Sequence, residues 1–267
     1  MKRFIAFSTI LALVAMILSC TKGAVNGNDS DKNSKNSYTI KFSDTVIGVN
    51  QWIELTTNYT SDNPNILVTW FDNGERCNRL ARTHTTYLWT PEKAGDHTIK
   101  CSITDREGII EFEASVKVVE CDYDKAIIGD SKDKIIRTYN DPRYDTGNTI
   151  GYGWGRDDVR EFTFSGNNLS KIHFEEHTQW PTVNQYPHLG LLSMYEEQVT
   201  ELSRKYGKPS SQSNLGSTQA EKEANAKSIY NSGAMYADWK YNGCTINLMA
   251  ARSSVYTPGF YWEIEVK

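Results

Sequence analysis

The pattern of apolar and polar positions divides the chain into three regions. An unbroken apolar run extends from Phe4 to Leu18. From Tyr38 to Glu120, apolar and polar residues alternate with the period of two that is typical of strands buried on one face. From Asp124 to Lys267, alternating segments are interspersed with segments of helical spacing. The pattern predicts an all-β domain followed by a mixed domain of helices and strands.

Alternating segments predict the strands of the first domain. Residues 97–103 place larger buried-type side chains at every second position, and the alternation resumes after the turn Asp105–Gly108. Asp and Gly at the ends of this turn favour a hairpin. Upstream, residues 66–70 form another inward row that ends at Asp72-Asn73-Gly74, and residues 53–57 form a weaker one. We expect these strands to pack as a sandwich.

Helices and hairpins are both predicted in the second domain. Ser131 is suited to cap a short helix that ends before Pro142, because proline cannot continue a helix. A second helix is expected from Leu191 to Tyr206, where apolar residues recur at helical spacing. The remaining elements are two hairpins and a closing strand, over residues 162–174, 239–248 and 260–266.

The two halves of this domain resemble each other. Each has a helix ending in Tyr-x-x-Pro and then a hairpin with an aromatic residue shortly before the glycine of its turn. Phe164 with Gly166 corresponds in this way to Tyr241 with Gly243. We interpret the halves as diverged repeats whose strands form one antiparallel sheet. Coincidence is the alternative, because Tyr-x-x-Pro is a short match.

The start of the chain has the parts of an export signal: Met1-Lys2-Arg3, an apolar run shorter than the roughly 20 residues that span a bilayer, and a small residue before Cys20. Ile17-Leu18-Ser19-Cys20 resembles the lipobox of bacterial lipoproteins, in which the cysteine is lipidated. An ordinary cleaved signal with an incidental cysteine is the alternative. We expect residues 1–20 to be a lipoprotein signal peptide and the polar residues 21–37 to be a flexible tether.

The first domain resembles a bacterial immunoglobulin-like or polycystic-kidney-disease-type β-sandwich over residues 38–120. Trp70, Trp89-Thr90-Pro91 and Ala94-Gly95-Asp96-His97 carry this resemblance. The second strand has no cysteine and His97 stands where a corner tyrosine is expected, so the sequence departs from antibody-type domains. The resemblance implies a spacer or a binding module.

The second domain, residues 124–267, resembles small outer-membrane assembly lipoproteins and β-lactamase-inhibitor-like proteins. Residues 128–135 (Ile-Gly-Asp-Ser-Lys-Asp-Lys-Ile) and Tyr139–Pro142 carry this resemblance. It implies an α+β domain in which helices pack on an antiparallel sheet and hold a protein partner. The expected fold class is therefore an immunoglobulin-like sandwich followed by an α+β repeat domain.

The cysteines after Cys20 are Cys77, Cys101, Cys121 and Cys244. An exported chain meets oxidising conditions, in which disulfides form. We expect Cys77 to pair with Cys101, with a buried free thiol at Cys101 as the alternative. Cys121 and Cys244 would then be left to pair with each other, although spacing alone does not fix connectivity. The spacings do not match a zinc site.

Composition narrows the class of partner. The 267 residues carry a net charge of −4 without a basic stripe, which argues against nucleic acid. The 7 Trp and 15 Tyr suit β-rich packing and also sugar or peptide contacts. Tyr152 and Trp154 lie among glycines, whereas Trp180 and Tyr186 each precede a proline. We predict these four aromatics as a ligand-binding site, with a satellite core as the alternative.

Motifs for catalysis are missing from the sequence. It has no Gly-x-Ser-x-Gly elbow and no phosphate loop. His173, Glu175 and His177 share one face of a predicted strand, and that face could hold a metal ion, but we interpret it as solvated surface. Asp157-Asp158 with Glu175-Glu176 could act on sugars, but acidic doublets are usually surface. We predict no catalytic residue, metal or cofactor.

These observations favour a lipid-anchored binding or adhesion module of the cell envelope, with a protein or glycan as partner. Thr21 after the cysteine favours the outer membrane, at its surface or periplasmic face. An assembly lipoprotein that docks another envelope protein is the main alternative, and a glycan-acting hydrolase is a further one.

Overall fold

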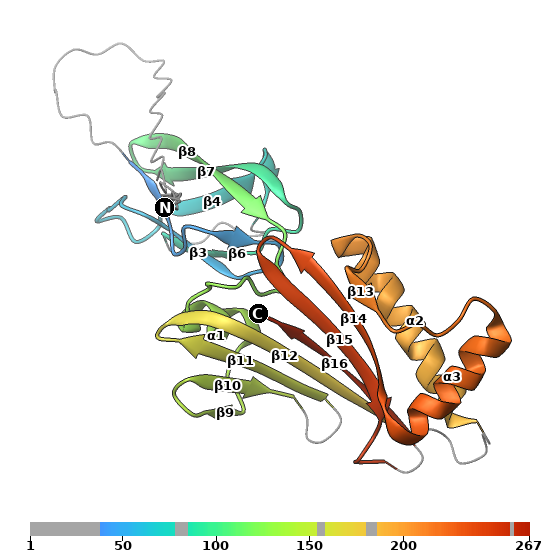
Figure 1. Cartoon of the computed structure of the whole chain (residues 1–267). Coiled ribbons are helices and arrows are strands. Elements are labelled where there is room, and N and C mark those ends of the chain that lie inside the picture. The colour runs from blue at the N-terminus through green and yellow to red at the C-terminus, as the bar shows by residue number, and fades with distance from the viewer. Residues whose placement is uncertain (1–37, 78–84, 154–157, 180–185, 257–258) are drawn as a thin grey trace, which may run out of the picture. The chain divides into compact units, whose positions relative to one another are not determined.

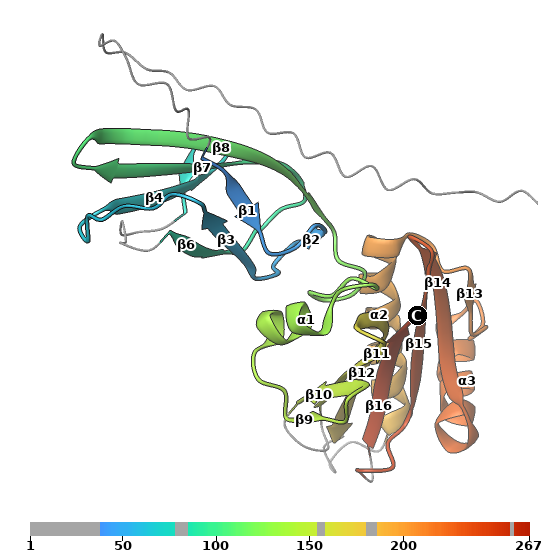
Figure 2. The same cartoon turned by 90° about the vertical axis from the view of Figure 1, so that its left-hand side faces the viewer.

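The computed structural model of the chain describes residues 38–77, 85–153, 158–179, 186–256 and 259–267. These residues form three β-sheets and three α-helices, and most of the regular structure is β (Figures 1 and 2). The chain separates into two compact units. The first holds the described parts of Met1–Ser43, Glu54–Trp89 and Asp96–Lys117, and the second holds those of Asp44–Ile53, Thr90–Gly95 and Val118–Lys267. None of the described helices is both long and apolar enough to cross a membrane.

Two sheets are built from strands β1 to β8 (Figure 2). The order β1-β3-β6 joins Ile40–Phe42, Ile53–Thr57 and Thr86–Trp89. The order β2-β8-β7-β4-β5 joins Ile47–Gly48, Gly108–Val119, Gly95–Asp105, Leu67–Asp72 and Glu75–Arg76. The β2–β8 pair is parallel, whereas β4 pairs antiparallel with both β5 and β7.

The predicted strand alternation of the first unit is confirmed. On β7, His97, Ile99, Cys101 and Ile103 are buried, and Trp70 on β4 lies beside Cys101 in the register. At the β4–β5 turn, φ is 50° at Asn73 and 85° at Gly74, the left-handed pair that a tight two-residue hairpin turn requires. Local sequence therefore specifies both the inward row and its turn.

The predicted Cys77–Cys101 disulfide is not formed in the structure, because both cysteines have free thiols. The Cys77 amide donates to the Trp70 carbonyl on one side of β4, and Cys101 pairs with Trp70 on the other side. The two cysteines are therefore two strand spacings apart, about 9.5 Å, whereas a disulfide needs Cα atoms within about 7 Å. Cys121 and Cys244 are also free; the Cys121 thiol contacts the Val49 carbonyl at 3.3 Å.

One sheet spans the second unit, in the order β13-β14-β15-β16-β12-β11-β10-β9. Its neighbouring strands are antiparallel, and β12 pairs with β16 at the centre. In chain order from β9 to β16 the strands are Tyr144–Asp145, Thr149–Tyr152, Asp158–Ser165, Asn168–Gln179, Ser211–Gln212, Ala234–Tyr241, Cys244–Arg252 and Gly259–Val266. The predicted hairpin turns are confirmed, with positive φ at Gly166, Asn242 and Gly243.

The helices of the second unit are α1 (Lys132–Tyr139), α2 (Pro187–Tyr206) and α3 (Gln219–Ser232). Ser131 caps α1 as predicted, by accepting a hydrogen bond from the Lys134 amide. The second helix begins before the predicted Leu191, because Pro187 is suited to the first helical turn. The third helix was not predicted; it starts with a capping box formed by Thr218 and Glu221.

The helices lie on one face of this sheet (Figure 1). α2 packs on β14, β15 and β16, and α3 packs on α2, β14 and β15. Tyr139 of α1 contacts the Phe162 ring of β11 at 4.8 Å. We call this the helix-side face; on β12 and β16 it carries Ile172, Phe174, Glu176, Phe260, Trp262 and Ile264. We call the opposite side the polar face; on the same strands it carries His173, Glu175, His177, Tyr261, Glu263 and Glu265.

A buried ion pair lies between α1 and the turn before it. Lys134 Nζ lies 2.7 Å from Asp130 Oδ1 and donates to the Val46 carbonyl, and Gln51 Nε2 donates to Asp130 Oδ2. All of these residues belong to the second unit. Since each buried charge has its partners, the cluster is a structural one.

Candidate functional site

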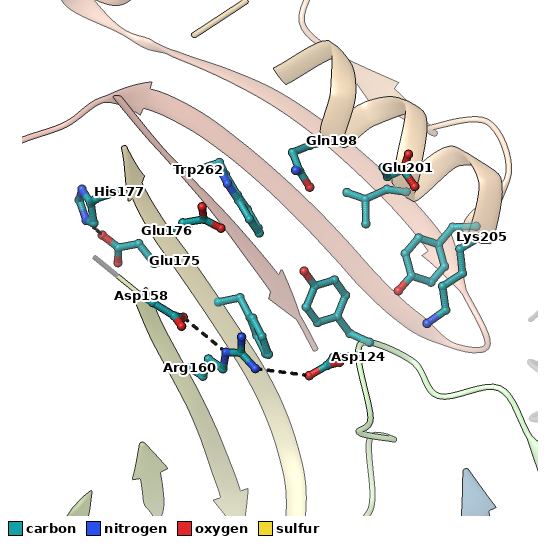
Figure 3. A pocket seen from close by; sticks show the side chains of 14 residues that line it. Asp124, Asp158, Arg160, Glu175, Glu176, His177, Gln198, Glu201, Lys205 and Trp262 are labelled. Carbon is teal, nitrogen blue, oxygen red and sulfur yellow. Dashed lines mark hydrogen bonds and ion pairs between the residues drawn. The ribbon is translucent and has the colours of Figure 1, made fainter. Parts of the chain in front are cut away.

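A cleft of about 730 Å³ opens on the helix-side face of the second unit (Figure 3). Its walls come from β11, β12, β16, α2 and the segment that precedes α1. The lining residues are Tyr123, Asp124, Asp158, Arg160, Phe174, Glu175, Glu176, His177, Gln198, Glu201, Leu202, Lys205, Tyr206 and Trp262. The cleft lies where the helix-side face of β12 is flanked by α2, which packs on β14 to β16.

Aromatic rings form the apolar part of the cleft. Phe174 of β12 contacts the Tyr123 ring at 4.9 Å, in an edge-to-face arrangement. Trp262 of β16 lies between Glu176 of β12 and Ala250 of β15 in the sheet register. Figure 3 shows Trp262 and Glu176 side by side at the cleft. Such a surface can stack a flat apolar ring or the face of a sugar.

Arg160 of β11 organises the charges of the cleft. Its guanidinium lies 3.4 Å from an oxygen of Asp158 and 3.9 Å from one of Asp124 (Figure 3). It also lies over the Phe174 ring, 5.2 Å from the centroid. The arginine therefore offsets charge from two carboxylates and holds an aromatic ring in place. The result is a polar wall with much of its charge already paired.

The last turns of α2 supply a stripe of cleft residues. Gln198, Glu201, Leu202 and Lys205 follow the spacing of three and four that places side chains on one helix face. Burial lowers the pKa of Lys205, opposed by the nearby Cys121 thiol and by carboxylates. The stripe offers an amide, a carboxylate and an amine within reach of the aromatic rings.

The polar face holds a second cluster of chemically active groups. The ligand atoms of His173, Glu175 and Glu263 lie within 4.8 Å of one another. His173 Nε2 lies 3.5 Å from Glu175 Oε2, and His177 Nε2 is hydrogen-bonded to Glu175 Oε1. Burial raises the pKa of Glu263, and the neighbouring Glu175 and Glu265 add to the rise, against His173 and Lys171. Glu175 and His177 border the cleft as well.

Ser253, His177 and Glu175 form a hydrogen-bonded string, but its geometry does not suit a nucleophile. The Ser253 hydroxyl contacts His177 Nδ1 at 2.9 Å. It also accepts hydrogen bonds from the amides of Val255 and Tyr256, and Ser253 is only 3 % exposed. A nucleophilic serine needs access to substrate and a free lone pair. We therefore assign Ser253 the task of orienting the imidazole.

The structure separates the aromatics that were predicted as a binding site. Tyr152 on β10 packs against Tyr139 and Phe162, at 5.6 and 5.8 Å between ring centroids, so it belongs to a core cluster rather than to an exposed platform. Tyr186 precedes α2, is 54 % exposed and contacts the His188 ring. Trp154 and Trp180 lie outside the described residues. Neither described member lines the cleft.

Sequence reasoning missed Trp262 and Arg160. Both lie on strands, where aromatic and charged residues are ordinarily assigned to core or surface. The sequence does not distinguish Trp262 from its neighbours, because it follows the same alternation as Phe260, Ile264 and Val266. Its partial burial depends on what covers the strand, and periodicity carries no information about that.

No protein-family model matches this chain. No curated protein matches it either. One solved structure that matches is described as "Structural basis for the promiscuous specificity of the carbohydrate-binding modules from the beta-sandwich super family". Sequence identity is 16 %, the match covers 56 % of each chain, and the TM-score is 0.29. The chain thus spans about half the length of that protein, and a TM-score this low carries no argument about fold or ligand.

Proposed function

We propose that this chain is a non-catalytic binding protein of the cell envelope, anchored through a lipid on Cys20. Its ligand would occupy the cleft of the second unit. The observation that carries this proposal is the combination of Trp262 and Phe174 with hydrogen-bonding side chains in a cleft of about 730 Å³. Pockets of a few hundred Å³ or more, with apolar walls and a few convergent polar groups, are typical of ligand sites.

The finer features of the fold belong to the same proposal. The two sheets built from β1 to β8 would form an immunoglobulin-like spacer. The second unit would be a pair of diverged repeats, each contributing a helix and a hairpin to the common sheet. Along the chain, the spacer would come between Cys20 and the segment that forms the cleft.

A carbohydrate is the ligand that the cleft chemistry favours. The partly buried Trp262 ring offers a stacking surface, whereas Gln198 and Glu176 offer hydrogen bonds to hydroxyl groups. Arg160 pairs with Asp158 and Asp124, which leaves less unpaired charge to select an ion. Since the lining also carries more carboxylates than basic side chains, a ligand with many hydroxyl groups suits the site better than an anionic one.

Glycan binding by the Trp262→Ala variant tests this proposal. The full chain in detergent would be titrated by calorimetry against a panel of soluble cell-wall and host-type oligosaccharides. We expect a bound member to lose at least about tenfold in affinity, since aromatic anchors commonly contribute about 2 kcal/mol or more. Tyr236→Ala is the matched control, because Tyr236 is an exposed aromatic residue on β14 outside the cleft.

If both variants lose glycan affinity equally, or if Trp262→Ala loses none, the cleft is not the ligand-binding site. If no oligosaccharide in the panel binds, a carbohydrate ligand is excluded and a protein ligand is favoured instead. The Tyr186→Ala variant tests the aromatic site predicted from sequence separately: a loss of glycan affinity in this variant would place Tyr186 at the ligand.

Membrane fractionation of a Cys20→Ala variant tests the anchor. The native chain should remain with membranes, whereas the variant should be released, because acyl chains on this residue would supply the membrane affinity. Identical fractionation of the two forms would exclude the lipid anchor. If the anchor is confirmed, protease treatment of intact cells distinguishes its two possible locations. Loss of the native chain indicates the outer surface, and protection indicates the periplasmic face.

A further inference from the structure

Two glutamates lie directly opposite each other on the polar face. Glu175 of β12 pairs with Glu263 of β16 in the antiparallel register. Like charges in this position are unfavourable, because the Cβ atoms of directly opposite residues are only about 5 Å apart. Lys171 contacts Glu265, the next residue along this face of β16, rather than either member of the pair. The Glu175–Glu263 pair therefore lacks a lysine or arginine ion pair among the described residues.

Imidazole nitrogens flank this carboxylate pair. His173 Nε2 lies 3.5 Å from Glu175 Oε2, and the ligand atoms of His173, Glu175 and Glu263 lie within 4.8 Å of one another. Ligands of a tetrahedral zinc ion are about 3.3 Å apart, since zinc–nitrogen and zinc–oxygen distances are about 2.0–2.1 Å. The three side chains are thus close to the spacing that one ion needs, and a small rotation of the Glu263 side chain would bring its carboxylate closer to the other two.

An outer layer of contacts orients Glu175, one of these three residues. His177 hydrogen-bonds to Glu175, and its other nitrogen meets the Ser253 hydroxyl at 2.9 Å. Because that hydroxyl accepts from two backbone amides, its own proton points to His177 Nδ1. His177 Nε2 then carries the proton that it donates to Glu175. Ring stacking on Tyr261, at 5.0 Å between centroids, fixes the imidazole further. Hydrogen-bonded ligating carboxylates of this kind are characteristic of metal sites.

We propose that His173, Glu175 and Glu263 form a binding site for one divalent transition-metal ion, with zinc as the best fit. One imidazole and two carboxylates suit zinc or manganese better than magnesium or calcium, which prefer all-oxygen sites. Three protein ligands leave a coordination position for water or another small ligand. The ion would tie β12 to β16 and neutralise the opposed glutamates.

Metal binding by the full chain in detergent tests this site. After chelator treatment, the chain would be titrated with Zn²⁺ by calorimetry and with Co²⁺ by absorption spectroscopy. We expect one ion per chain and a Co²⁺ spectrum without a thiolate charge-transfer band, which separates this site from the cysteines. Glu263→Gln and His173→Gln should each weaken binding by more than about 100-fold, because changes to outer-layer partners alone cost about 10- to 100-fold.

Glu265→Gln is the matched control, since Glu265 lies on the same strand and face but pairs with Lys171 and Lys267. It should change affinity little. Lack of saturable binding, a thiolate band, or equal loss in Glu265→Gln and Glu263→Gln would each overturn the proposal. Should Glu263→Gln fail to fold, as judged by circular dichroism, His173→Gln carries the same test.

The site does not depend on the proposed carbohydrate function. Trp262→Ala should keep metal binding while losing glycan binding, and Glu263→Gln should lose metal binding whether or not a glycan binds.

Discussion

The two faces of the eight-stranded sheet are built from the same strands but carry opposite chemistry. On β16, Phe260, Ile264 and Val266 are buried under the helices, whereas Glu263 and Glu265 between them face the other way. On β12 the same alternation separates Phe174 from Glu175. The helix-side face is held by burial of apolar surface, and the polar face is held by pairwise interactions between side chains. Function can therefore differ between the faces while the backbone is shared.

The difference shows that a single strand can serve two kinds of site. The helix-side face has a cleft because Trp262, unlike its neighbours Phe260 and Ile264, is only partly buried. The polar face has a metal-ligand geometry because two glutamates meet across one strand pair. The effects of substitutions on the free energy of unfolding should consequently differ between the two faces in size and in sign.

The largest effect is expected from Trp239→Ala on the helix-side face. Trp239 of β14 is fully buried, and its indole donates to the Gly207 carbonyl at 3.0 Å. Removing a buried tryptophan should cost about 3–5 kcal/mol of unfolding free energy. Tyr236→Ala, on the same strand but 52 % exposed, should change stability by less than about 0.5 kcal/mol. Urea unfolding measures both, and comparable losses would contradict the contrast between the faces.

A smaller effect is expected from Thr218→Ala, which removes the cap of α3 in the helical layer. The Thr218 hydroxyl accepts from the Glu221 amide at 3.2 Å, and loss of such a cap costs about 1 kcal/mol. Hydrogen bonds from the Thr218 and Ser217 amides lower the pKa of Glu221 to about 2.

Because that pKa is depressed in the folded state, the contribution of Glu221 is present above its ordinary value of 4.5 and is lost as pH falls toward about 2. Thermal unfolding from pH 5 to pH 2 should therefore show a gap in stability between the native chain and Glu221→Gln that narrows with acid, because only the native chain carries the titrating carboxylate. A gap that is constant over this range would exclude the reciprocal cap.

The smallest effect, and one of opposite sign, is expected from Glu263→Gln in the absence of metal. Removing one of two directly opposed carboxylates should raise stability by a few tenths to about 1 kcal/mol. Glu265→Gln should instead lower it slightly, because Glu265 forms ion pairs with Lys171 and Lys267. Thermal unfolding in chelator distinguishes the two. A loss of stability in Glu263→Gln would show that Glu263 makes a favourable contact when metal is absent.

Strands and their turns were well predicted from local patterns. The inward row from His97 to Ile103 and the turn at Asn242-Gly243 each depend on residues within a few positions of one another. Period-two alternation and left-handed turn residues depend only on neighbouring positions. Strand faces and hairpin turns can therefore be predicted without knowledge of the tertiary contacts.

Helix α3 was missed for a physical reason. Of its residues, Ala226 and Tyr230 are buried, so the apolar stripe that marks an amphipathic helix is too sparse to recognise. Its capping box at Thr218 and Glu221 was the signal that could have found it. The early start of α2 at Pro187 was missed because the predicted limit followed apolar spacing rather than the proline.

Local sequence patterns are enough to establish which residues share a face of each strand, where the hairpins turn, and that His173, Glu175 and His177 lie together. The sequence also contained the lipobox-like residues that lead to the anchor prediction at Cys20. Tertiary structure decided which strands are neighbours. The β12–β16 pairing brings Glu263 to Glu175, and the placement of α2 leaves Trp262 at the edge of a cleft. Alternation is a local property of the backbone, whereas strand pairing and helix coverage depend on packing between distant segments.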